Sequence, residues 1–224
     1  MKKLLPGLIF LIAFFGLFEA FSQNTSNKGT EFWVAYSSNS DDTNSRLSLF
    51  LTSTTNAVVN ITVGGIPYSQ NPIQLIAGQA IPVVIDPNIY LNAYIDGSDV
   101  VKTNAGIHIT SDVPIIVYSH MSNAARSAST LILPVKALGN EYYPISYIQS
   151  PTSQNREAYS EFTIVGVENN TVIEITPSVN SIGNIKPAKQ PFQVTLNKGD
   201  VYQYKSVSDI TGTYIKTIGD CKPV

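Results

Sequence analysis

Hydrophobic and polar residues alternate with a period of two along most of this chain, and turn residues interrupt the alternation about every 8 to 12 positions. The alternating stretches are rich in Val, Ile, Thr, Tyr and Phe, which favour pleated strands. The pattern therefore predicts an all-β protein. The predicted strands are 32–36, 47–52, 58–63, 73–76, 81–85, 106–110, 114–120, 159–168, 172–177, 192–196, 200–205 and 214–218.

One stretch departs from this alternation. Residues 123–129 contain three alanines, and alanine has the highest helix propensity, so we expect one short helical turn there. The extended pattern returns at 130–133.

Two parts of the chain repeat the same order of elements. The segment 56–63 resembles 170–177, and each is followed by a strand that begins at a proline and ends at a glycine turn. We therefore predict two units, 23–140 and 141–224, each an antiparallel β-sandwich, with β-propeller-like blades as the alternative. Chance similarity between Asn- and Thr-rich hairpins is the other explanation of the repeat.

Both copies also reach a similar edge, at Pro114 in the first and Pro223 in the second. A strand follows Pro114, whereas the sequence stops at Val224, so we expect this sequence to be part of a longer protein. Cys221 is the only cysteine. In an exported protein, we expect it to form a disulfide with a cysteine outside this chain.

The first 22 residues have the features of a secretory signal peptide. Lys2 and Lys3 precede an apolar run at 4–18, and Ala20-Phe21-Ser22 fits the small-x-small cleavage rule, so the mature chain is expected to start near Gln23. The run is shorter than the roughly 20 apolar residues of a transmembrane helix. We expect a secreted or cell-surface protein whose mature chain does not insert into a membrane.

Charge and titratable groups narrow the possible functions. The formal net charge is −2 at pH 7, and the basic residues are scattered, which argues against nucleic-acid binding. The only histidines are His108 and His120. His108 alternates with two isoleucines and is expected on the solvent side of its strand, and His120 lies beside Ser119, which a strand directs to the opposite face. We therefore expect no enzymatic activity.

Cofactor sites are also not expected. Neither histidine has neighbours with the spacing of zinc ligands. The loop at 40–44 gathers oxygen atoms of the kind that bind calcium, but it lacks the glycine and the distal glutamate of an EF-hand, so we expect a solvated turn there. Trp33, the only tryptophan, lies in an alternating strand and is expected in the core.

Tyrosines are the best candidates for ligand contacts, because a tyrosine presents a rigid face with a polar tip. Three of them follow Gly139, and the loop before it contributes further polar side chains. Tyrosines that cover a core edge and hydrogen-bond locally are the alternative. The candidate binding residues are His120, Asn123, Arg126, Tyr142, Tyr143 and Tyr147.

Several segments together resemble the N-terminal domain family of IgG-Fc-binding protein, which also occurs in secreted surface proteins of gliding bacteria that use type IX secretion. These segments are 29–36 (GTEFWVAY), 107–120, 131–134 (LILP), 138–143 (LGNEYY) and 196–202 (LNKGDVY).

The resemblance implies an adhesion or binding module of a larger extracellular protein, in contact with a glycoprotein or polysaccharide. Immunoglobulin binding is not carried over to this chain. A structural spacer without a ligand is the alternative.

Overall fold

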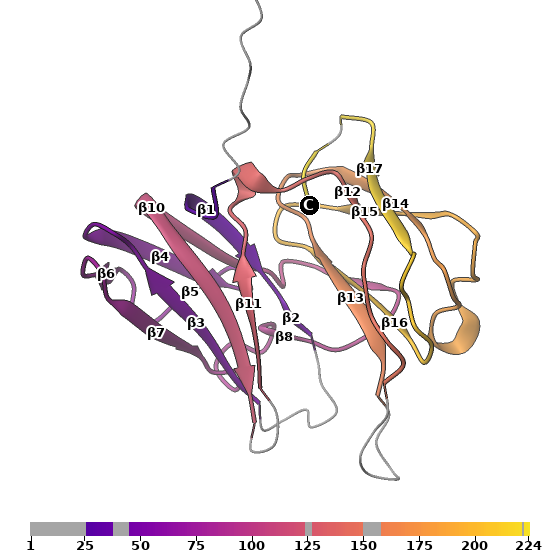
Figure 1. The fold of residues 1–224 in the computed structure, drawn as a ribbon, viewed down its shortest axis with the longest axis horizontal. Coiled ribbons are helices and arrows are strands. Elements are labelled where there is room, and N and C mark those ends of the chain that lie inside the picture. Colours follow the sequence, from indigo (N-terminus) through magenta and orange to yellow (C-terminus); the bar gives the residue numbers. More distant parts are fainter. Residues whose placement is uncertain (1–25, 38–44, 124–126, 150–157, 221) are drawn as a thin grey trace, which may run out of the picture.

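Strands make up most of the regular structure. The computed structural model describes residues 26–37, 45–123, 127–149, 158–220 and 222–224, so the predicted signal peptide lies outside the described residues. The helices within these ranges are the short 3-10 turns η2 (Val135–Ala137) and η3 (Ile182–Asn184). The all-β prediction is confirmed, and Figure 1 shows the strands gathered in two halves.

The first half is a two-layered structure around one hydrophobic core. Its inward-facing residues alternate along the strands, as Leu47, Leu49 and Leu51 do, and these three side chains are completely buried. The strands are β1 (Gly29–Val34), β3 (Arg46–Thr52), β4 (Ala57–Val63), β5 (Ile66–Pro67), β6 (Ile73–Leu75), β7 (Ala80–Ile85), β10 (Ile107–Ser122) and β11 (Ser127–Ile132).

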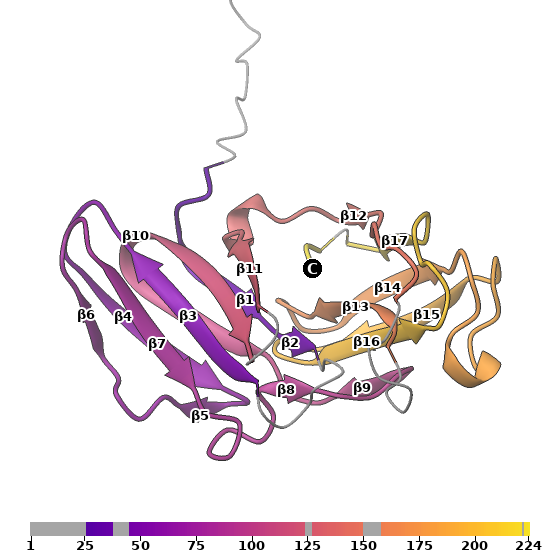
Figure 2. The same cartoon turned by 60° about the horizontal axis from the view of Figure 1, so that its bottom comes forward.

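β10 joins the two layers, and the prediction of two separate strands at 106–110 and 114–120 was wrong. Up to Ser111 this strand pairs with β4, and from Ile116 onward it pairs with β3 on one side. Pro114 lies between these two ladders, where its missing N–H costs no ladder hydrogen bond. The chain therefore stays extended through the proline and passes from one layer into the other (Figure 2).

The second half has two sheets, ordered β13-β16-β9 and β12-β17-β14-β15. Tyr202 and Tyr204 of the first sheet are buried against Ile173, Ile175 and Ile215 of the second. A small parallel pair, β2 (Tyr36–Ser37) with β8 (Tyr94–Ile95), lies outside these sheets. The strands of the second half are β9 (Val100–Lys102), β12 (Glu141–Tyr142), β13 (Ser160–Val165), β14 (Thr171–Thr176), β15 (Phe192–Leu196), β16 (Val201–Ser206) and β17 (Tyr214–Ile218).

Two predictions about organisation have different outcomes. The division into 23–140 and 141–224 stays a prediction, and β9, which lies within 23–140, pairs with β16 of the second half. The helical turn at 123–129 is wrong for Ser127 to Ser129, which belong to β11. Pairing with β10 overrides the weak helix preference of these residues. Residues 124–126 lie outside the described part.

Candidate functional site

The solvent-facing side of one layer in the first half carries a group of aromatic and aliphatic side chains. This layer consists of β7, β3, the second part of β10, and β11, in that order. The alternate residues of β3 face the core, so Arg46, Phe50 and Thr52 face the other side, and Ser48 lies on that side as well although it is buried. We call the outward-facing residues of these four strands the platform: Arg46, Ser48, Phe50, Thr52, Ala80, Pro82, Val84, Ile116, Tyr118, His120, Ser122, Ser127, Ser129 and Leu131.

Strand register places the platform residues in rows across the sheet. Phe50 is opposite Pro82 on one side and Tyr118 on the other, and Tyr118 is opposite Leu131. Cross-strand neighbours on one face have their Cβ atoms about 4.5–5.5 Å apart, so these four side chains form one continuous row. The next row brings His120 beside Ser48.

The aromatic rings of the platform are accessible to a partner. Phe50 is 36% exposed and Tyr118 is 40% exposed. The ring of His120 meets Phe50 edge to face, with 5.9 Å between centroids and an interplanar angle of 74°. The rings stand on paired strands and have few rotatable bonds. Binding of a ligand to them therefore costs the protein little side-chain entropy.

A buried tyrosine supports the platform from below. Tyr36 is 5% exposed, and its hydroxyl donates to the backbone carbonyl of Ser48. Burial raises the pKa of Tyr36 well above its ordinary value, so the hydroxyl remains a proton donor at any physiological pH. This bond fixes the backbone of β3 directly beneath the row that contains His120.

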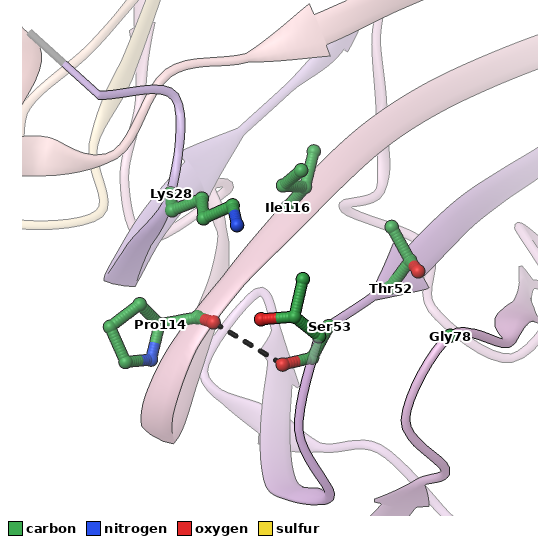
Figure 3. Close-up of a pocket in the computed structure, with 7 residues that line it drawn as sticks. Lys28, Thr52, Ser53, Gly78, Pro114 and Ile116 are labelled. Carbon is green, nitrogen blue, oxygen red and sulfur yellow. Dashed lines mark hydrogen bonds between the residues drawn. The ribbon is translucent and has the colours of Figure 1, made fainter.

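A pocket of about 130 Å³ adjoins one end of the platform. Thr52 and Ile116 are opposite each other in the platform and also line this pocket, so the two surfaces are continuous. Figure 3 shows the Lys28 side chain reaching toward Ile116 with its amino group over the pocket. The lining residues are Lys28, Thr52, Ser53, Thr54, Gly78, Pro114 and Ile116.

The charge of this surface differs from that of the whole chain. The formal net charge of the chain is −2, yet none of the fourteen platform residues is an aspartate or a glutamate. Arg46 lies at one end of the platform, and Lys28 lies at the pocket at the other end. The platform is therefore a surface of aromatic rings and hydroxyls between two cations.

The candidate residues expected from the sequence do not form a single patch. His120 belongs to the platform, and Asn123 follows the last residue of β10 and is half-buried. Arg126 and Cys221 lie outside the described residues. The three tyrosines belong to the second half, where Figures 1 and 2 place β12 away from the end of β10.

The three tyrosines have different environments. The Tyr142 hydroxyl accepts a hydrogen bond from the Gly139 N–H and donates to the Val224 carbonyl at 2.9 Å. Burial raises the pKa of Tyr142, and we assign it a structural role. Tyr143 stacks on Tyr214, with centroids 5.0 Å apart, and Tyr147 is 70% exposed. Both Tyr143 and Tyr147 are exposed, and neither belongs to the platform.

Phe50, Tyr118 and Lys28 are the site residues that sequence analysis missed. The alternation in 47–52 and 114–120 already indicates that Phe50 and Tyr118 face away from the core. What the pattern does not contain is the register that makes them neighbours. Lys28 had no sequence signal, because its position follows from the pairing of Gly29 with Ile115.

His108 and Trp33 lie at the junction between the two halves. Their rings stack at a centroid distance of 4.2 Å, and Glu31 Oε1 accepts hydrogen bonds from His108 Nε2 at 2.9 Å and Lys198 Nζ at 3.1 Å. Trp33 is only half-buried, so its expected place in the core was wrong. In β1 the neighbours Phe32 and Val34 face the core, which directs Trp33 to the other side.

We expect the protein to lose stability at mildly acidic pH because of His108 at this junction. Burial lowers the pKa of His108 below 6.5, although the hydrogen bond to Glu31 opposes the shift. The unfolded state then takes up the proton first as the pH falls. The contribution of neutral His108 to the free energy of unfolding is therefore fully present above pH 6.5, and it declines as the pH falls toward the pKa of His108 in the folded state.

We expect His108→Gln to flatten this decline, measured by urea denaturation between pH 7.5 and about 5. Although burial alone would raise the pKa of Glu31, hydrogen bonds from Lys198 and His108 hold it below 4.5, so Glu31 does not contribute in this window. A variant that loses stability as steeply as the native protein would contradict the assignment.

The described residues provide neither a cluster of metal ligands nor a membrane-spanning helix. Within the ranges that the structure describes, no group of three or more His, Cys, Asp or Glu side chains is placed to hold a metal ion. The loop at 40–44, where we expected a solvated turn, lies outside those ranges. No helix found among the described residues has the length and apolar character needed to cross a membrane.

Comparison with known proteins confirms the family resemblance. The model of the family described as IgGFc binding protein matches residues 128–224. The human IgGFc-binding protein is 28% identical over 130 residues, which cover 57% of this chain and 2% of the human protein. This chain thus corresponds to a small fraction of that relative's length. No solved structure matches the chain.

Proposed function

With its resemblance to IgGFc-binding protein as the premise, we propose that this chain is a secreted or cell-surface binding module of a larger extracellular protein. Its partner is a glycoprotein or a polysaccharide, and its binding surface is the platform. The name of the human relative states that it binds IgGFc, which supports a binding role for this chain.

The observation that carries the proposal is the row of Pro82, Phe50, Tyr118 and Leu131. Soluble proteins bury most large aromatic side chains, and contiguous exposed apolar surface marks interaction sites. Exposed rings on a rigid sheet suit the flat apolar face of a sugar, and the serine and threonine hydroxyls around them suit its polar edges.

The proposal is a binding function without catalysis. The two histidines belong to different environments, because His108 is stacked on Trp33 at the junction and His120 meets Phe50 on the platform. They are therefore not placed to act on one substrate. A spacer role remains the second candidate, and the apolar row on the platform is the observation that disfavours it.

We expect a double substitution, Phe50→Ala with Tyr118→Ala, to weaken binding at least about tenfold, because central aromatic residues dominate binding energy. The measurement applies the secreted chain to an array of glycans and mucins and then titrates the best ligand. The matched control is Tyr143→Ala with Tyr147→Ala, which removes two exposed aromatic rings from the second half.

Each result of this experiment has a definite meaning. Loss of binding in the platform variant together with normal binding in the control supports the proposal. The opposite pattern would move the site to the tyrosines of the second half. Absence of any ligand on the array favours the spacer role, and binding that survives enzymatic removal of glycans identifies a protein surface as the partner.

A further inference from the structure

We propose that the platform and its adjoining pocket recognise an acidic saccharide, with a sugar carboxylate held in the pocket by Lys28. This inference rests on the proposed function and names the ligand class of the same site. It comes from three features of the surface: the position of the Lys28 amino group, the continuity of the pocket with the aromatic row, and the distribution of charge along the platform.

The position of Lys28 follows from the start of β1. Gly29 is paired with Ile115, so the preceding residue lies beside Ile116 at the pocket. An added Cβ on Gly29 would lie 2.2 Å from the Pro134 Cβ, so only glycine allows this close approach of β1. Lys28 itself is half-buried, and its amino group is directed over the pocket (Figure 3).

The pocket suits one carboxylate on a sugar ring. Pro114 and Ile116 provide apolar surface, Lys28 provides a single positive charge, and Thr52 and Thr54 also line the opening. The Ser53 hydroxyl is already directed to the Pro114 carbonyl, at 3.4 Å. A partly desolvated ammonium group forms a stronger hydrogen bond to a carboxylate than to a neutral hydroxyl.

The platform extends the pocket into a track for more than one sugar. From Thr52 to Arg46 the rise of β3 spans about 20 Å, at roughly 3.3 Å per residue. The row of Phe50 and Tyr118 comes next to the pocket, the row of His120 and Ser48 follows, and Arg46 is at the far end. A linear chain along this track meets aromatic faces between two cations.

The absence of acidic residues from the platform favours a negatively charged ligand at this surface. In the chain as a whole, acidic residues outnumber basic ones by 16 to 14. The fourteen platform residues include no carboxylate, so a negatively charged ligand meets no like-charge repulsion from these described residues. The attraction to Lys28 and Arg46 should weaken with added salt, because dissolved ions screen charges that are not fully buried.

Oligomers of galacturonic acid test this inference against the same oligomers with their carboxyl groups reduced. By isothermal titration calorimetry at low salt, we expect the acidic oligomer to bind at least about tenfold more tightly than its neutral counterpart. Lys28→Gln should remove most of that difference, and Lys28→Arg should retain most of it. Lys189→Gln, an exposed lysine in the second half, is the control for the loss of one positive charge.

The outcomes separate this inference from the proposed function. Equal affinity for both oligomers, or an unchanged affinity in Lys28→Gln, overturns the carboxylate assignment, while the proposed function stands if the Phe50 and Tyr118 double variant still loses binding. No binding of either oligomer also overturns it. If the double variant binds normally, the aromatic platform is not the site. A dimer that the double variant dissociates identifies a second copy as the occupant and refutes the saccharide.

Discussion

Leu49→Ala will lower the free energy of unfolding by about 2–5 kcal/mol, the range for a leucine truncated inside a close-packed core. Leu49 is completely buried and lies between Leu47 and Leu51 on the inward face of β3. Its removal leaves a cavity between the two layers of the first half. Urea denaturation measures the loss, and the fluorescence of Trp33, the only tryptophan, reports unfolding.

The matched control is Phe50→Ala, one position further along the same strand. Phe50 faces outward and is 36% exposed, so its truncation should cost far less stability than that of Leu49. The pair also separates stability from binding, because only the Phe50 change is expected to reduce ligand affinity in a fully folded protein. Equal destabilisation by the two substitutions would contradict the assignment of the two faces of β3.

Gly166→Ala will destabilise the protein by about 1–3 kcal/mol or more, because the added methyl group has no space. An ideal Cβ on Gly166 would lie 2.4 Å from the Asn197 carbonyl oxygen and 2.8 Å from the Leu196 Cβ. The first of these atoms is backbone, so relief requires the turn itself to move. The loss is measured by thermal or urea denaturation.

The same turn connects the two halves, which enlarges the effect. Gly166 donates to the Asp200 carbonyl and accepts from the Gly199 N–H, and the Gly106 N–H of the first half donates to the Gly199 carbonyl. The buried Asp200 carboxylate also accepts from the Asn104 N–H at 2.8 Å. Displacement of the turn therefore weakens the contact between the halves as well as the hairpin.

Gly139→Ala is the control for this substitution. Its added Cβ would find its nearest heavy atom, the Tyr142 hydroxyl oxygen, at 3.7 Å, an ordinary contact distance. We expect little change in stability from this variant. If Gly166→Ala were as mild, the close packing of the 196–200 turn against Gly166 would be wrong.

The hydrophobic pattern was sufficient for most strands because each strand has one buried face. The alternation at 47–52 fixes which side of β3 faces the core, since a shift by one residue would expose three leucines. The same reasoning failed at Trp33, because its strand has a second partly covered side. The second half of the molecule covers that side, through Lys198 and Gly199, and local alternation carries no information about such a neighbour.

The candidate site could be predicted from the sequence to a smaller extent than the strands. His120 was found from the sequence as a polar group next to an extended segment, but the tyrosines expected beside it belong to another part of the molecule. Tyr142 is held by Gly139 and Val224, which local sequence does not reveal. The neighbours that His120 has in the structure, Phe50 and Ser48, precede it by about seventy residues.

The sequence by itself determined the all-β class, the inward and outward faces of β3, and the family resemblance, because these follow from alternation and from short motifs. The tertiary structure alone decided that Phe50 lies beside Tyr118 and that Lys28 lies at the pocket. Register between distant strands is set by the burial of a shared core, and no single segment contains that information.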